Sequence, residues 1–218
     1  MKVKVTPSKV HGNVKIPASK SMAHRALICA SLSDGTSIVS NVTNSKDIEA
    51  TVGCMKALGA NIKQIDETTY EVTGTNLFKQ EGNITCSANE SGSTLRFLIP
   101  LAACTNAKVK FLGQGRLLQR PMDVYENEFK KQNIEFNQSD KEIIVHGNLQ
   151  AKDYVVQGDI SSQFITGFMF VLPLLNQDST LTITKPYEST SYVNLTIQML
   201  AKFGIEIIET SSNSYLIK

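Results

Sequence analysis

The chain has 218 residues, enough for one large domain or two small ones whose core needs neither disulfides nor a metal. Its net charge is only +2, and its 18 lysines are spread without forming a basic stripe, so we expect no nucleic-acid partner. The longest apolar runs, 97–104 and 168–175, are far shorter than the roughly 20 residues that span a bilayer, so we expect no membrane partner either.

The residue types that usually carry metal or nucleophilic chemistry do not cluster in this sequence. The four cysteines lie in apolar or strand-like stretches and none has metal-ligand spacing, so we expect reduced core residues of a cytoplasmic protein. His11, His24 and His146 are scattered and have no evident Ser or Cys partner. The glycines at 113 and 115 lack the third glycine of a dinucleotide motif. We therefore expect no metal, no cofactor and no nucleophilic mechanism.

In chain order, residues 1–7 alternate Lys with Val and predict a strand. Beyond residue 12, one pattern occurs three times at a period of about 70 residues, which divides the chain into segments of about 13–76, 77–150 and 151–218. Such self-similarity is typical of a fold built from repeated supersecondary units.

Each copy contains a Ser-rich loop, a helix, a strand, an amphipathic helix and a pair of strands, in that order. In the first copy we predict these elements at 17–21, 22–32, 36–42, 48–58, and 61–65 with 70–73. In the second copy the equivalent segments are 89–93, 94–104, 108–112, 122–129, and 134–137 with 143–146. In the third copy they are 158–162, 163–175, 180–184, 193–200, and 205–209 with 215–217. Gly59, Asn133 and Gly204 follow the amphipathic helices and predict left-handed caps.

A βαβαββ unit of this kind has one apolar face that it cannot bury alone. Three such units packed around a pseudo-three-fold axis can bury their apolar faces together, with the helices inside. We therefore predict one α/β (α+β) domain over residues 13–218, preceded by the strand-forming segment 1–12.

The chain has only four arginines, and all four lie in or beside the Ser- and Gly-containing loops that open helices: Arg25, Arg96, Arg116 and Arg120. One such arginine would be interpreted as a surface ion pair or a helix cap. Four in equivalent loops favour an anionic ligand, because guanidinium groups and free N–H groups at helix N-termini both bind phosphate or carboxylate. Ser21, Ser93 and Ser162 in these loops are plausible N-caps as well as ligand-binding residues.

These loops resemble the motifs of the enolpyruvyl transferases, and specifically of the 5-enolpyruvylshikimate-3-phosphate synthases. The matching segments occur in the family's order across almost the whole chain: Ile16 to Ala26, Ser91 to Arg96, Gln119 to Met122, Ser161 to Phe164, and Ser189 to Tyr192.

The resemblance implies an enzyme of two domains and six such units, which transfers the carboxyvinyl group of phosphoenolpyruvate to the 5-hydroxyl of shikimate 3-phosphate and releases phosphate. Both substrates lie between the domains. In the family, the first dozen residues help to form the second domain, and that domain supplies the acid and base carboxylates. We therefore expect the present 218 residues, without the C-terminal domain, to bind shikimate 3-phosphate without turnover.

The same resemblance implies which residues bind the substrates. The residues expected to hold shikimate 3-phosphate are Ser21, Arg25, Ser161, Ser162, Gln163, Ser189 and Tyr192, with Ser161, Ser162 and Ser189 on its phosphate. The residues expected to contact phosphoenolpyruvate are Lys20, Gly92 and Arg120, with Gln163 between the two ligands.

The sequence departs from the family pattern at Ala18, Glu90 and Ser93, where Gly, Asn and Thr are usual. Glu90 could pair with Lys20 or Arg96 and reshape the phosphoenolpyruvate subsite, whereas Asp47 could either balance Lys20 or cap a helix.

Two alternative functions remain open at this point. One is the related transferase acting on a UDP-sugar, although residues 113–120 lack the cysteine that this family carries. The other is a stand-alone module that binds a phosphorylated metabolite.

Overall fold

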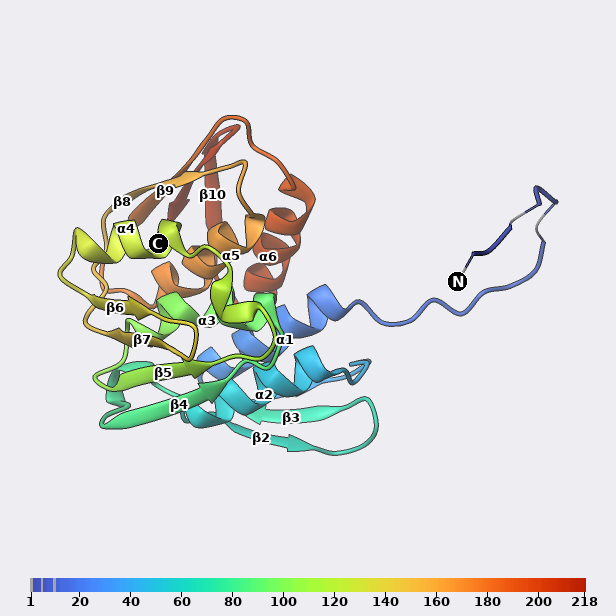
Figure 1. The fold of residues 1–218 in the computed structure, drawn as a ribbon, viewed down its shortest axis with the longest axis horizontal. Helices are drawn as coiled ribbons and strands as arrows, with labels where there is room; N and C mark the ends of the chain where they lie inside the picture. Colours follow the sequence, from blue (N-terminus) through green and yellow to red (C-terminus); the bar gives the residue numbers. More distant parts are fainter. Residues whose placement is uncertain (1, 5, 10) are drawn as a thin grey trace.

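A computed structural model describes residues 2–4, 6–9 and 11–218. Figure 1 shows three small sheets on the outside of the molecule, with helices gathered between them. The described residues that precede α1 extend away from this body. Each sheet belongs to one of the three sequence repeats.

The first unit forms a three-stranded antiparallel sheet in the order β1-β3-β2. Its elements are α1 (Lys20–Leu32), β1 (Thr36–Val39), α2 (Lys46–Ala57), β2 (Asn61–Gln64) and β3 (Tyr70–Thr73), followed by the short 3₁₀ helix η1 (Leu77–Lys79).

The second unit forms a four-stranded sheet in the order β4-β5-β7-β6, in which β4 and β5 are parallel. Its elements are β4 (Asn83–Ser87), α3 (Gly92–Ala102), β5 (Lys108–Leu112), η2 (Leu117–Gln119), α4 (Asp123–Lys130), β6 (Glu135–Gln138) and β7 (Ile143–His146).

The third unit repeats this topology in the order β8-β9-β11-β10, with β8 parallel to β9. Its elements are β8 (Asp153–Gln157), α5 (Ser162–Val171), η3 (Leu172–Leu174), β9 (Ser179–Thr184), α6 (Thr190–Lys202), β10 (Ile207–Ser211) and β11 (Ser214–Ile217).

The predicted fold class is confirmed: three related units surround a helical interior. The left-handed caps are confirmed too, because Gly59, Asn133 and Gly204 all have positive φ. One difference is that the first unit contains no strand equivalent to β4 or β8 among its described residues. The predicted strand over residues 1–7 is wrong for residues 2–4, 6 and 7, and its other residues, 1 and 5, lie outside the described part. A strand requires a neighbour for its backbone hydrogen bonds, and these exposed residues pack beside none.

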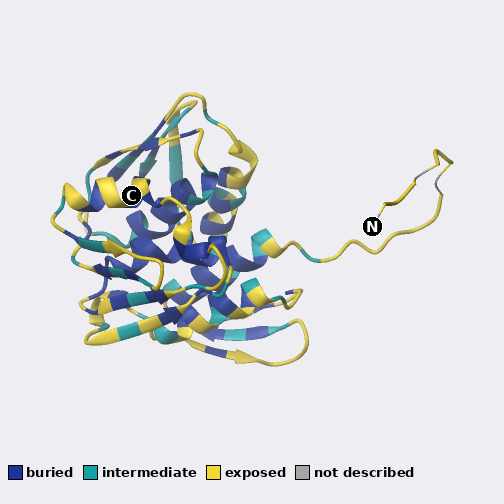
Figure 2. Cartoon of the chain, in the orientation of Figure 1, coloured by how far each residue is buried: buried dark blue, intermediate teal, exposed yellow. Residues whose placement is uncertain are grey.

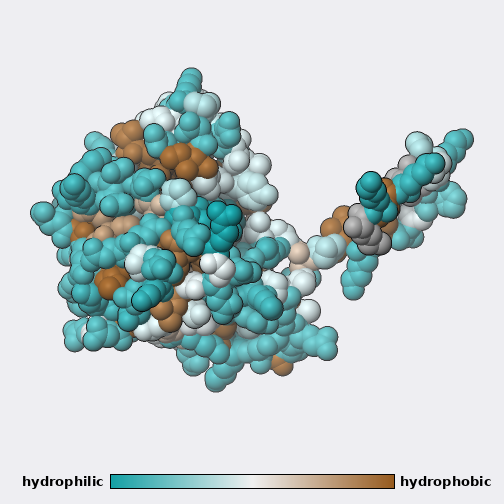
Figure 3. Space-filling model, viewed as in Figure 1, coloured by the Kyte–Doolittle hydropathy of each residue, from teal (hydrophilic) through white to brown (hydrophobic). Residues whose placement is uncertain are grey.

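The core lies where α1, α3 and α5 meet (Figure 2). Nine of the eleven residues of α3 are buried, and α3 packs along α5. All four cysteines are buried and carry free thiols. On the face shown in Figure 3, hydrophilic side chains predominate and hydrophobic ones form only small patches. Over the described residues, no helix is both long and apolar enough to cross a membrane.

At Gly167, α5 comes close to Tyr125 and to the backbone of α3. A Cβ at this position would overlap the Tyr125 hydroxyl and lie 2.6 Å from the carbonyl oxygen of Arg96. The same hydroxyl donates a 2.6 Å hydrogen bond to that carbonyl, so neither atom can move without breaking the contact. The lack of a side chain at 167 therefore determines how closely α5 approaches α3.

We predict that Gly167→Ala lowers the free energy of unfolding by about 2 kcal/mol, because the added methyl group must displace backbone and a buried hydroxyl. Gly53, exposed in α2 with open space around its Cα, provides a matched control. Gly53→Ala should raise stability by about 0.5–1 kcal/mol, because alanine favours a helix interior. Urea unfolding of both variants measures the difference, and equal effects would contradict the packing argument.

Candidate functional site

Four helices, α1, α3, α5 and α6, begin around one pocket of about 370 Å³. The residues that line it are Ser21, His24, Arg25, Ser93, Phe97, Ile160, Ser161, Ser162, Gln163, Ser189 and Tyr192. All seven residues expected to hold shikimate 3-phosphate are among them. The free N–H groups of helix N-termini favour anions, so several helices that begin at one pocket make it suited to a negatively charged ligand.

The N-caps of these helices differ from the predicted ones. Ser19, Ser91 and Ser161 are the caps, and their hydroxyls accept hydrogen bonds from the backbone N–H groups of Met22, Thr94 and Gln163. The predicted caps Ser21, Ser93 and Ser162 instead lie inside the first helical turn and line the pocket. Because the capping is done by other serines, these three hydroxyls are not used as caps.

Ser189 caps α6 in an unusual way. Its backbone is left-handed, with φ of +55°, and its side chain makes no capping hydrogen bond. A left-handed conformation costs a residue other than glycine roughly 1–2 kcal/mol. Ser189 is exposed and lines the pocket. Because its backbone conformation is unfavourable, the surrounding structure must maintain it.

Arg25 is buried, with 3% of its surface exposed, and it makes no ion pair with a carboxylate of the described residues. Its guanidinium donates to the Thr196 hydroxyl at 2.8 Å and to the backbone carbonyls of Ser21 and Tyr192 at 2.8 and 3.0 Å. The group lies over the Phe97 ring, 5.3 Å from its centroid. Burial lowers the pKa of Arg25 to about 10, which leaves the group charged at neutral pH. A cation held only by neutral acceptors lines the pocket.

Gly92, Arg96 and Arg120 form a second cationic group next to this pocket. A Cβ at Gly92 would contact the guanidinium groups of both arginines, so both lie close over the start of α3. Burial, and then the charge of Arg120, lower the pKa of Arg96. Gln163 joins the two groups, because its side chain accepts from Arg96 at 2.8 Å and donates to Ser93 at 2.9 Å. Arg116, by contrast, is exposed and does not line the pocket.

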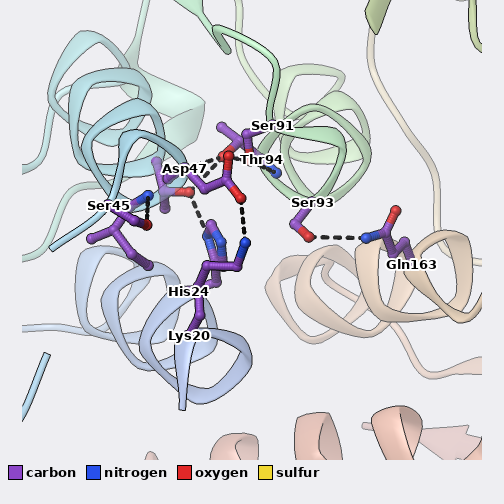
Figure 4. A network of polar contacts seen from close by, with 10 residues as sticks. Lys20, His24, Ser45, Asp47, Ser91, Ser93, Thr94 and Gln163 are labelled. Carbon is purple, nitrogen blue, oxygen red and sulfur yellow. Dashed lines mark hydrogen bonds and ion pairs between the residues drawn. The ribbon is translucent and has the colours of Figure 1, made fainter. Parts of the chain in front are cut away.

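Lys20 pairs with Asp47 across α1 and α2 (Figure 4). Ser45 caps α2, so of the two roles considered for Asp47 the structure has the counter-charge. The expected pairing of Glu90 with Lys20 or Arg96 is wrong for the described residues, because Glu90 makes an ion pair with neither. Its carboxylate instead lies against Gly115. Lys20 itself does not line the pocket.

His24 belongs to a buried chain of hydroxyl groups that the sequence did not reveal. Its Nδ1 lies 2.7 Å from the Thr51 hydroxyl, which lies 2.7 Å from the Thr94 hydroxyl (Figure 4). Its Nε2 is buried and has no partner among the described residues. The only sign of such a role in the sequence is that His24 lies in the same helical turn as Arg25. These hydrogen bonds connect His24, which lines the pocket, to α2 and α3.

Burial lowers the pKa of His24 to about 4, an effect that the Asp47 charge partly opposes and the Lys20 and Arg25 charges reinforce. Unfolded histidine titrates near 6.5, so the unfolded state takes up this proton first as the pH falls. We predict that the free energy of unfolding decreases as the pH is lowered from about 6.5 to about 4, by up to roughly 3 kcal/mol.

Urea unfolding across this pH range, compared with His24→Asn, isolates the contribution of His24, and imidazole NMR shifts follow its protonation directly. The same pH dependence in the variant, or a pKa of His24 near 6.5, would contradict this prediction.

Comparison with known proteins identifies the family of this chain. The family model for EPSP synthase (3-phosphoshikimate 1-carboxyvinyltransferase) matches residues 5–218. The 3-phosphoshikimate 1-carboxyvinyltransferase of Clostridium perfringens (strain SM101 / Type A) is 46% identical over 219 residues, which cover 100% of this chain and 51% of that protein. The enzyme of the same name from Clostridioides difficile (strain 630) is 43% identical over 99% of this chain and 52% of its own length. The chain thus spans about half the length of the curated relatives it matches.

Among solved structures, an EPSP synthase from Acinetobacter baumannii superimposes with a TM-score of 0.78 over 94% of this chain and 46% of its own, at 18% sequence identity. At that identity the likeness concerns the fold alone. The match to the family model over nearly the whole chain shows that this chain belongs to the EPSP synthase family.

Proposed function

We propose that residues 13–218 form the shikimate 3-phosphate-binding half of a 3-phosphoshikimate 1-carboxyvinyltransferase. In this proposal the pocket binds shikimate 3-phosphate, with Ser161, Ser162 and Ser189 on the phosphate. Arg25, Ser21 and Tyr192 then hold the rest of the ligand. The proposed compartment is the cytoplasm, which is consistent with four free thiols.

The observation that carries the proposal is the burial of the Arg25 guanidinium in the pocket without a carboxylate partner among the described residues. A buried charge normally pairs with an opposite charge, because removing it from water is costly. An anionic ligand would supply the missing charge. The starts of α5 and α6 bring Ser161, Ser162 and Ser189 to the same pocket, and serine hydroxyls at helix N-termini suit a phosphate group.

Phosphoenolpyruvate would bind beside this pocket, at the group formed by Gly92, Arg96 and Arg120. Two closely spaced guanidinium groups disfavour each other's charge, and an anion bound between them relieves that repulsion. Gln163 would lie between the two ligands, because it already contacts Arg96 and Ser93. Lys20 would join this subsite by exchanging Asp47 for the ligand.

The catalytic acid and base would come from the C-terminal half of the enzyme, which we propose as the partner of this domain. Enzymes of this kind need at least ~8 kcal/mol of transition-state stabilisation. Charge-assisted contacts from one side of a cleft contribute about 1.5–3 kcal/mol each and do not transfer protons.

We predict that residues 1–218 bind shikimate 3-phosphate and that Ser162→Ala weakens this binding about tenfold, because one hydrogen bond to a charged group is lost. Amide NMR titration measures the affinity and locates the shifts, which should centre on Ser21, Arg25 and Ser161 to Gln163. Shikimate, which lacks the phosphate, should bind Ser162→Ala and the unmodified chain equally.

Ser179→Ala is a matched control. Ser179 is a buried serine at the start of β9, whereas Ser189 follows the end of this strand, and the Ser179 hydroxyl has no partner among the described residues. Its binding should equal that of the unmodified chain. No binding at millimolar shikimate 3-phosphate would overturn the proposed function of this half.

We also predict that residues 1–218 alone do not transfer the enolpyruvyl group, and that adding the C-terminal half of a relative restores transfer. Phosphate release from phosphoenolpyruvate in the presence of shikimate 3-phosphate measures this. Turnover by residues 1–218 alone would contradict the assignment of proton transfer to the other half. Binding without restored turnover would instead favour a stand-alone module for a phosphorylated metabolite.

A further inference from the structure

Two loops that carry pocket serines run side by side at the edge of the third sheet. One follows β8 and leads to Ser161 and Ser162, and the other follows β9 and leads to Ser189. Because β8 and β9 are parallel neighbours, with Gln157 opposite Thr184, both loops leave the sheet at the same edge. Their separation therefore determines the spacing of the three hydroxyls.

Gly158 is where the two loops touch. A Cβ at this position would overlap the carbonyl oxygen of Thr184 and lie 2.7 Å from that of Pro186. Both obstacles are backbone atoms, one at the end of β9 and one in the loop that follows it, so no side-chain rotation can relieve them. The amide of Glu188 also donates a 3.1 Å hydrogen bond to the carbonyl oxygen of Gly158. Only glycine allows the loops to approach this closely.

Tyr187 connects the second loop to a strand of the third sheet. Its hydroxyl lies 3.2 Å from the hydroxyl of Tyr215, which stands on β11 beside β9. Burial raises the pKa of Tyr187 well above its usual range, so the hydroxyl stays protonated and able to donate. Tyr187 is placed between Pro186, which contacts Gly158, and Ser189, which reaches the pocket.

Ser189 depends on this support because its left-handed backbone is not held by a capping hydrogen bond of its own side chain. A small displacement of the loop would therefore move its hydroxyl away from Ser161 and Ser162. A phosphate oxygen is bound well only when several donors converge on it within hydrogen-bond distance.

We propose that Gly158 and Tyr187 are positioning residues that set the spacing between the Ser161–Ser162 loop and Ser189, and thereby determine the preference of the pocket for a phosphorylated ligand. This inference rests on the proposed function, in which these three serines bind the phosphate. Neither residue needs to touch the ligand.

The test compares shikimate 3-phosphate with shikimate as probes, because a positioning role alters the preference between them. NMR titrations of the full chain give both affinities. Gly158→Ala should weaken binding of shikimate 3-phosphate at least about tenfold, and Tyr187→Phe about threefold, through poorer hydrogen bonds to a charged group. The affinity for shikimate should stay within about twofold, so that the ratio of the two affinities falls.

Matched controls are available elsewhere in the fold. Gly53→Ala adds the same methyl group in open space, and Tyr70→Phe removes a hydroxyl that bonds Asn44 in the first unit. Both should keep the ratio of the unmodified chain. Should Gly158→Ala not fold, Tyr187→Phe still decides the question, because it adds no atoms.

Three results would overturn the inference. An unchanged affinity ratio in Tyr187→Phe would show that the loop spacing does not depend on this residue. Equal losses for both probes would show a general structural role only. An unmodified chain with no preference for the phosphorylated probe would overturn the proposed function together with this inference, whereas the first two outcomes leave the proposed function intact.

Discussion

Burial of the Arg25 guanidinium constrains the arrangement of the helices around the pocket. The group needs oxygen acceptors in place of water, and they come from α1, α5 and α6: the Ser21 carbonyl, the Thr166 hydroxyl at 3.4 Å, and the Thr196 hydroxyl with the Tyr192 carbonyl. A charge buried in this way costs several kcal/mol unless those bonds are kept. These bonds therefore hold the three helices in the relative positions that also place their first turns at the pocket. The contacts that stabilise the buried guanidinium therefore also shape the pocket.

Much of this architecture could be predicted from the sequence because it follows from local patterns. Apolar residues at helical spacing located α2 and α6, and β-branched runs located β5 and β9 within a residue of their bounds. Loop composition alone could not identify the N-caps, because each of the first two loops offers two serines two positions apart and only the exact start of the helix decides between them. In these two loops the serines not used as caps, Ser21 and Ser93, are the ones at the pocket.

The remaining features depend on contacts between segments far apart in the sequence. Asp47 rather than Glu90 balances Lys20 because α2 packs beside α1, which no local pattern reveals. The chain from His24 through Thr51 to Thr94 crosses three helices and uses residues that individually look like ordinary helix positions. The strand expected at the N-terminus had the right alternation, but its described residues have no neighbouring strand, and alternation alone does not supply one.

The bonds of Arg25 also bear on how the chain acquires its structure during synthesis. Arg25 and its partner Thr196 are 171 residues apart, so the ribosome completes the first helix long before three of the four groups that bond its guanidinium exist. Until α5 and α6 have been synthesised, the guanidinium lacks these acceptors, so the first unit cannot complete the packing around Arg25 on its own. The pocket is thus among the last parts of the domain to form, and a ligand of the pocket can stabilise a nascent chain only after the third unit has been translated.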